Sequence, residues 1–144
     1  PMTAIKPPTE KVEQAHGVAC LRTLGAQVYV LGTSRRKGDY PGTMQTPGLP
    51  DVLAVLPSLT GPARPTRPAC LLFWEVKSER GRLRPAQAEF AALIASAFAW
   101  SLTVDHVTGT FDVLLSWLVR EGYVKGENVA AHRVVAGKEP VHVP

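Results

Sequence analysis

The pattern of apolar and polar residues in the first half of the chain predicts one helix followed by three strands. Thr9 is expected to cap a helix that runs to about Leu24, because acidic residues occupy its first turns and an apolar stripe follows. The alternating run 27–31 and the run 51–56 (DVLAVL) predict two strands. The segment 71–76 (LLFWEV) is apolar and rich in β-favouring residues, which predicts a third, central strand.

The second half predicts two helices around one more strand. Pro85 suits the first turn of a helix that continues to Ala97. Residues 100–104 are expected to form the last core strand, and 110–121 a closing helix, while the pattern from Gly122 onward is ambiguous. The core is expected to include three aromatic residues, Phe98, Trp100 and Trp117. The order α-β-β-β-α-β-α is typical of an α/β or α+β domain with a mixed central sheet flanked by helices.

Length and composition favour a single domain. The 144 residues are expected to comprise an extended arm (1–8), a core (9–107) and a C-terminal helix with a tail (108–144). No apolar stretch reaches the roughly 20 residues that a bilayer span requires, and no export signal is evident, so we expect an intracellular, cytoplasmic protein. The two cysteines, Cys20 and Cys70, have apolar neighbours and are expected to be buried thiols.

Positive charge is concentrated in the middle of the chain. The whole sequence has a formal net charge of +4, whereas the segment 35–84 contains nine basic and four acidic residues and is therefore +5. Its basic residues are Arg35, Arg36, Lys37, Arg64, Arg67, Lys77, Arg80, Arg82 and Arg84. A basic middle beside a nearly neutral remainder favours a polyanionic partner such as nucleic acid.

Two charged residues interrupt the most apolar strand. Glu75 and Lys77 are two positions apart, so the period of a strand places both side chains on one face. Asp51 opens the preceding predicted strand and would lie beside Glu75 if the two strands pair. Two carboxylates with nearby carbonyl oxygens suit Mg²⁺ or Mn²⁺. Read singly, the residues are also compatible with a salt-bridged strand end and a turn aspartate.

Four short motifs in this order resemble the VRR-NUC domain, a branch of the PD-(D/E)XK nuclease superfamily. They are Glu10 with Gln14, GLPD (48–51), EVK (75–77) and GRLRPAQ (81–87), and together they cover roughly residues 9–107. The resemblance implies a restriction-endonuclease-like core. It also implies a metal-dependent phosphodiesterase that acts on DNA.

The resemblance assigns roles to residues of this chain. Asp51 and Glu75 would be ligands of Mg²⁺ or Mn²⁺, with the Val76 backbone carbonyl as a further ligand. Lys77 would be the catalytic lysine, and Gln87 would orient water or phosphate. An acid on the first helix would complete the metal shell, either Glu10 or, one turn further on, Glu13.

The expected substrate is branched or duplex DNA. Small stand-alone members of the family, bacterial or phage-encoded, are associated with four-way (Holliday) junctions that a homodimer cuts, and this sets the expectation here. Flanking phosphates would be held by basic residues, namely Arg35, Arg36, Lys37, Arg80, Arg82 and Arg84. The alternatives are a flap or nicking endonuclease of the same fold and a non-catalytic nucleic-acid-binding module.

Overall fold

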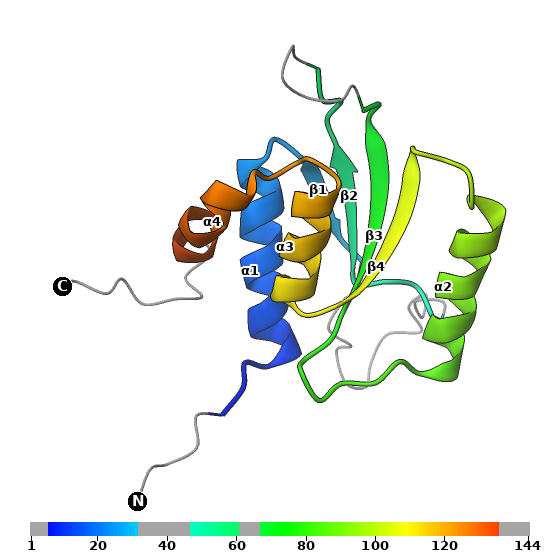
Figure 1. Ribbon diagram of the computed structural model, residues 1–144. Helices are drawn as coiled ribbons and strands as arrows, with labels where there is room; N and C mark the ends of the chain where they lie inside the picture. The colour runs from blue at the N-terminus through cyan, green and yellow to red at the C-terminus, as the bar shows by residue number, and fades with distance from the viewer. Residues whose placement is uncertain (1–5, 32–46, 61–66, 136–144) are drawn as a thin grey trace, which may run out of the picture.

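The computed structural model describes residues 6–31, 47–60 and 67–135, and its elements begin in the predicted order α-β-β-β-α-β-α (Figure 1). A short 3₁₀ helix and a further α-helix follow. The elements are α1 (Glu10–Thr23), β1 (Gln27–Val30), β2 (Val52–Leu56), β3 (Cys70–Val76), α2 (Pro85–Ala97), β4 (Val104–Gly109), α3 (Phe111–Arg120), η1 (Gly126–Asn128) and α4 (Val129–Val135).

The described strands form one mixed sheet in the order β1-β2-β3-β4, which confirms the α+β class. Strand β2 pairs antiparallel with both β1 and β3, whereas β3 and β4 are parallel. A parallel pair needs a long crossover connection, and α2 supplies it. The sheet therefore combines two antiparallel pairings with one α2-connected parallel pairing.

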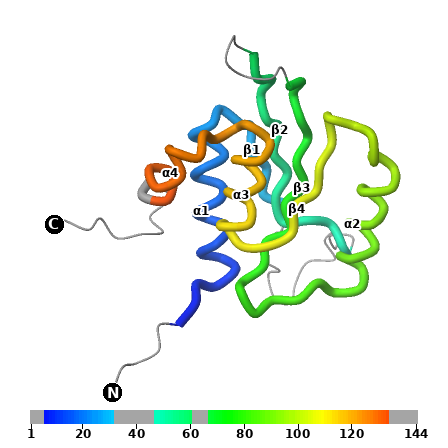
Figure 2. The backbone as a smooth tube through the Cα atoms, in the orientation of Figure 1, coloured from blue at the N-terminus to red at the C-terminus, as the bar shows by residue number. Residues whose placement is uncertain are grey.

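The helices lie on the two faces of this sheet (Figures 1 and 2). Helices α1, α3 and α4 group on one side, whereas α2 lies on the other side, beside β4. Alternate residues of β3 face the two layers. The ring of Phe73 is 5.3 Å from that of Phe90 on α2, whereas Trp74 faces α1. Odd-numbered side chains of β3 therefore point to the α2 layer. Glu75 is one of them, so its carboxylate lies on the α2 side of the sheet.

The core fills the space between the sheet and the layer of α1 and α3. Helix α1 approaches β3 closely at Gly17, where a Cβ atom would lie 2.1 Å from the ring of Trp74. Both cysteines are buried, as predicted, with Cys20 at 0% and Cys70 at 1% exposure. The predicted apolar face of α3 is buried too: Phe111, Leu114, Leu115 and Leu118.

The helix starts agree with the sequence analysis. The hydroxyl of Thr9 accepts a hydrogen bond from the Val12 amide (3.4 Å), and the hydroxyl of Thr110 accepts one from the Val113 amide (3.4 Å). Each threonine thus caps its helix by satisfying an amide that has no partner within the helix.

The predicted last strand was wrong in position. Residues 100–104 do not form a strand; the chain turns at 98–103, and β4 begins at Val104 and follows β3 to Gly109. Trp100 is 98% exposed and Phe98 41%, so their assignment to the core was also wrong, whereas Trp117 is buried as predicted. The segment 104–109 (VDHVTG) was overlooked because polar residues interrupt it. It is nevertheless a strand because β3 and the two flanking helices support it.

No helix in the described ranges is both long enough and apolar enough to cross a bilayer.

Candidate active site

The pairing of β2 with β3 brings Asp51 and Glu75 together. Val52 lies opposite Trp74, so the same register extended by one residue places Asp51 opposite Glu75. One carboxylate oxygen of Asp51 accepts a hydrogen bond from the backbone amide of Val76 at 2.9 Å. The expected strand pairing is thus present, and it holds an aspartate against the end of the central strand.

The sequence before Asp51 explains how the chain reaches this position. Gly48 has a φ of +93°, a conformation that residues with a side chain rarely adopt. A Cβ atom on Gly48 would also lie 2.5 Å from the carbonyl oxygen of Ala86 in the first turn of α2. Both the backbone conformation and the close contact with α2 therefore require glycine at position 48. Pro50 is buried immediately before Asp51.

Glu75 is held by two polar side chains on the α2 side of the sheet. It is 2% exposed, and its Oε1 accepts a hydrogen bond from the Gln87 amide group at 2.7 Å. The ammonium of Lys77 lies 3.6 Å from the same oxygen. Gln87 is itself oriented, because its Oε1 accepts a hydrogen bond from the Arg84 backbone amide at 2.8 Å. Four predicted site residues from β3, α2 and the start of β2 therefore meet: Asp51, Glu75, Lys77 and Gln87.

Ionisation of Glu75 is unfavourable because the side chain is buried and lies next to the carboxylate of Asp51. Burial, followed by the neighbouring Asp51 carboxylate, raises the pKa of Glu75 from 4.5 to about 8, and Lys77 only partly opposes this. A raised pKa on a buried acid beside another acid is characteristic of functional sites. A cation between the two carboxylates would relieve the repulsion.

The two acids of α1 have different surroundings. Glu13 is fully buried, and its Oε2 accepts a hydrogen bond from the Phe111 backbone amide at 2.7 Å, at the start of α3. Glu10 is exposed and lies near the side chain of Lys77. A Cβ atom on Gly81 would be 3.2 Å from both Glu10 Oε1 and the Lys77 side chain. Of the two candidates, Glu10 is therefore the one at the rim of the site.

Among the described residues, no three or more His, Cys, Asp or Glu side chains lie close enough together to hold a metal ion. Glu10 is thus not assembled with Asp51 and Glu75 into one such set. The acidic pair has Gln87 and the Val76 backbone as further polar neighbours.

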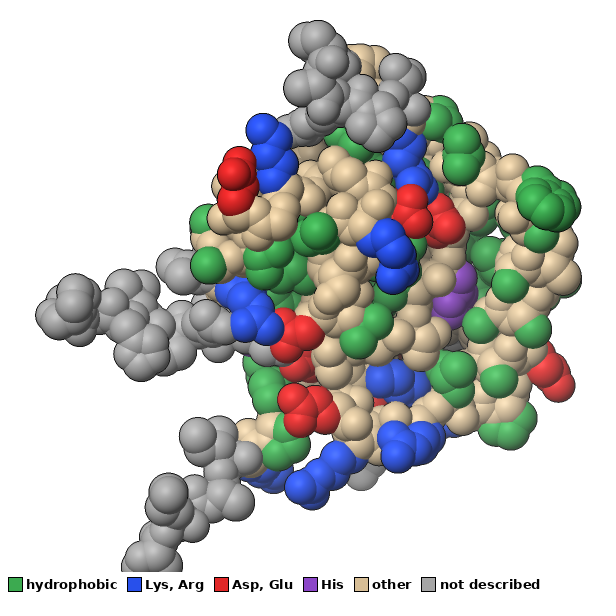
Figure 3. Space-filling view, in the orientation of Figure 1, with side chains coloured by type: hydrophobic (Ala, Val, Ile, Leu, Met, Phe, Trp, Pro, Cys, Tyr) green, Lys and Arg blue, Asp and Glu red, His purple; other side chains and the backbone are tan. Residues whose placement is uncertain are grey.

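Basic residues occupy the loop that joins β3 to α2, next to this pair. Arg80, Arg82 and Arg84 are all exposed there, and Figure 3 shows Lys and Arg side chains along the lower edge of the molecule. Their positions suit contacts to a phosphate backbone. The other three predicted DNA contacts, Arg35, Arg36 and Lys37, lie outside the described residues.

One residue of the basic segment is structural. Arg67 is 9% exposed and donates hydrogen bonds to Asp105 at 2.8 Å and to Glu121. Its guanidinium carbon also lies 5.6 Å from the ring centre of Trp117 and 5.2 Å from that of Tyr123. Arg67 therefore joins the residues just before β3 to β4 and to the C-terminal end of α3.

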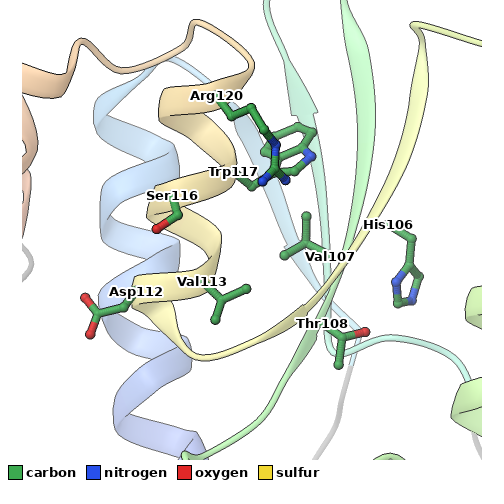
Figure 4. Close-up of a pocket in the computed structure, with 8 residues that line it drawn as sticks. All are labelled: His106, Val107, Thr108, Asp112, Val113, Ser116, Trp117 and Arg120. Atoms are coloured by element: carbon green, nitrogen blue, oxygen red, sulfur yellow. The ribbon is translucent and has the colours of Figure 1, made fainter.

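A separate open cleft of about 420 Å³ lies between β4 and α3 (Figure 4). Val107 points toward α3, whereas His106 points to the opposite side of the strand. Burial lowers the pKa of His106, which keeps its imidazole neutral at neutral pH. The single carboxylate of this cleft, that of Asp112, is paired with Arg133. The cleft has no pair of acids, so we place the candidate active site at Asp51 and Glu75.

Comparison of the chain with protein-family models, with curated proteins and with solved structures found no match.

Proposed function

We propose that this chain is a divalent-metal-dependent endonuclease that hydrolyses phosphodiester bonds of DNA. The observation that carries the proposal is the acidic pair of the half-buried Asp51 and the buried Glu75, with Lys77 beside Glu75 on the same face of the sheet. The resemblance of four short motifs to the VRR-NUC domain supports the same chemistry.

The residues present fit a hard divalent cation. Asp51 and Glu75 supply carboxylate oxygens, the ligands that Mg²⁺ and Mn²⁺ prefer. Their mutual repulsion, which contributes to the raised pKa of Glu75, would be relieved by a bound cation. The Val76 carbonyl and the carboxylate of Glu10 are the proposed further ligands. Bound there, the cation supplies a Lewis acid that neutralises phosphate charge and acidifies water.

The chain's own residues perform three further tasks. Lys77 places a positive charge next to the acidic pair, where it stabilises negative charge that develops on the phosphate. Gln87 donates to Glu75 and fixes the direction of that carboxylate. The exposed arginines of the 78–84 loop bind flanking phosphates and thereby hold the strand in place.

We propose a four-way junction as the preferred substrate. The resemblance to stand-alone VRR-NUC proteins supports this choice. The basic residues that lie near the site are on a loop and suit phosphate contacts, which favours selection by DNA shape over selection by base sequence.

The test is cleavage of labelled four-way junction, 5′-flap, single-stranded and linear duplex DNA in Mg²⁺ or Mn²⁺. We expect paired symmetric cuts on the junction that EDTA abolishes. Lys77→Met keeps the buried aliphatic stem and should lose cutting, whereas Lys125→Met, at an exposed lysine before η1, should cut like the wild type. Thermal unfolding of each variant separates lost chemistry from lost folding.

The other outcomes are equally informative. Cutting of flaps or of any duplex would keep the nuclease and reject the junction. DNA binding without metal-dependent cutting of any substrate would reject the nuclease in favour of a binding module. Calorimetric titration with Mn²⁺ gives an independent measure: Asp51→Asn should weaken binding of the cation strongly.

A further inference from the structure

An open cleft of about 580 Å³ lies beside the candidate active site, at the carboxyl ends of β3 and β4. These two strands are parallel, and just beyond them the backbone amide of Lys77 donates a hydrogen bond to the carbonyl of Gly109 at 3.0 Å. The volume is within the range of small-molecule sites. Ligands of open α/β sheets bind outside the carboxyl ends of parallel strands, so this position favours a binding site.

The cleft is bounded by the loop that joins β3 to α2 and by the turn that joins β4 to α3 (Figure 1). We call it the loop cleft. In Figure 4, Val113 points away from α3 toward the end of β4, where Thr108 lies. Side chains from both segments line the loop cleft: Lys77, Ser78, Arg82, Leu83, Thr108 and Val113.

Two exposed aliphatic side chains give the loop cleft apolar walls. Leu83 is 37% exposed between two arginines of the loop, and Val113 is 46% exposed in the first turn of α3. Gly109 makes room for Val113, because its φ is +145° and a Cβ atom there would lie 2.9 Å from the Val113 side chain. The hydroxyls of Ser78 and Thr108 line the same space. The loop cleft thus combines apolar walls with groups that can donate or accept hydrogen bonds.

This chemistry suits a nucleobase better than a phosphate. The first amide of α3, that of Phe111, donates to the buried carboxylate of Glu13 at 2.7 Å. That carboxylate offsets the positive end of the helix dipole, so the start of α3 does not attract a phosphate. A base has two apolar faces and a polar edge, and flipped bases are held between apolar side chains with hydrogen bonds to that edge.

Lys77 belongs to the loop cleft and to the candidate active site. It is 8% exposed, its ammonium lies 3.6 Å from Oε1 of Glu75, and its side chain lines the loop cleft. A nucleotide in the loop cleft would therefore adjoin the phosphate at the acidic pair. Arg82 is exposed at the loop cleft and suits contact with the phosphate of that nucleotide. A base that is paired and stacked within a duplex does not reach such a site.

We propose that the loop cleft holds one unpaired nucleobase of the DNA strand, in contact with Leu83 and Val113 and next to the bond that is cut. This inference rests on the proposed function, because it places the base relative to the acidic pair. Unstacking a base costs free energy, and it costs least when the base is already unpaired. The loop cleft therefore favours DNA with a poorly stacked nucleotide at the cut, as at a branch point, over continuous duplex.

The test uses a four-way junction that carries the fluorescent base 2-aminopurine at each branch-point position in turn, with Ca²⁺ in place of the metal that supports cutting. Stacking in DNA quenches 2-aminopurine. None of the described residues that line the loop cleft is aromatic, so a base that enters it should become several-fold brighter. We expect this increase with the wild type at one position of a strand.

Variants at the two apolar walls should remove the signal. Leu83→Ser and Val113→Ser should each abolish the increase and weaken junction binding about tenfold, because the base loses an apolar contact. Both side chains are substantially exposed, so thermal unfolding should change little. Leu93→Ser is the matched control: it removes a 60%-exposed leucine from α2, outside the loop cleft, and should behave like the wild type.

Cutting in Mg²⁺, measured separately, distinguishes this inference from the proposed function. A wild type that cuts junctions while 2-aminopurine stays quenched at every branch-point position would overturn the inference and keep the nuclease. So would an increase in fluorescence that Leu83→Ser retains. A Leu83-dependent increase in a wild type that cuts no substrate would keep the loop cleft as a base-binding site and reject the nuclease. A chain that binds none of these DNAs would reject both.

Discussion

Replacing Glu75 by glutamine should remove most of the pH dependence of stability that the metal-free protein shows between about pH 4.5 and pH 8. Glu75 is 2% exposed and adjoins Asp51, and burial followed by that neighbouring charge raises its pKa from 4.5 to about 8. The folded protein therefore keeps a proton on Glu75 at pH values where the unfolded chain has released it.

The sign and size of the effect follow from this difference. Below about pH 4.5 the side chain is protonated in both states, and the stabilising contribution of the buried neutral form is complete. As the pH rises, only the unfolded chain ionises freely, so the free energy of unfolding falls by up to about 1.4 kcal/mol per pH unit. The loss ends near pH 8 and amounts to at most about 5 kcal/mol. Glutamine stays neutral throughout and can still accept the hydrogen bond from Gln87.

Urea unfolding of EDTA-treated protein at a series of pH values measures this directly. Glu75→Gln should have a much flatter profile than the wild type and should be the more stable protein at pH 8. Glu79→Gln is the matched control, because Glu79 is exposed in the following loop and its loss should leave the wild-type slope in place. Equal slopes for the wild type and Glu75→Gln would refute the assignment of a raised pKa to Glu75.

Three further substitutions test the packing that supports the site. Gly48→Ala should lower both thermal stability and DNA cutting, because it combines a positive φ with a 2.5 Å clash against α2. The control is Gly122→Ala, which also has a positive φ (+86°) but whose nearest neighbour is 4.0 Å away; it should lower stability and leave cutting unchanged. Arg67→Met should cost about 2–3 kcal/mol in urea unfolding, less than a fully buried pair would, because the two carboxylates it bridges are each 30% exposed. Gly17→Ala should cost about 1–3 kcal/mol in urea unfolding because its Cβ would lie 2.1 Å from the indole ring of Trp74, whereas Gly126→Ala, with nothing within 4 Å, should be neutral. Equal urea midpoints for these two variants would refute the close approach of α1.

The part of the fold that short-range pattern determines was predicted well. Strand β3 was found because five of the six residues in the predicted segment 71–76 are apolar, and α3 because its apolar residues recur at helical spacing. The sequence also predicted that Asp51 and Glu75 would be neighbours if β2 and β3 pair, and strands that are consecutive in the chain usually do.

The misplacement of the last strand has a specific cause. Trp100 and Leu102 are apolar, and an apolar run in a small domain is normally taken for core. Strand β4 instead contains Asp105 and His106, whose partners come from distant parts of the chain: Asp105 binds Arg67, and the ring of His106 lies 5.9 Å from that of Phe90. Neither partner is visible from local spacing.

Arg67 shows the same limit for charge. In the sequence it is one of nine basic residues in a segment that favours a polyanion. Its carboxylate partners, Asp105 and Glu121, are 38 and 54 residues further along the chain, so no local pattern distinguishes it from the exposed arginines of the 78–84 loop. Counting charges identifies a basic segment, but only tertiary contacts show which basic side chains remain accessible to a ligand.

The two glutamates of α1 carry this argument to the candidate site itself. Glu10 and Glu13 are one turn apart, so they share a face of the helix and differ by about 4.5 Å in height. That rise is enough to separate their surroundings. Glu13 reaches the first amide of α3, an orphan donor that a buried carboxylate satisfies, whereas Glu10 stays at the level of Gly81 and Lys77. Which acid is free to face a cation is therefore decided by where α3 begins, almost 100 residues away, and not by any feature of the helix that carries both.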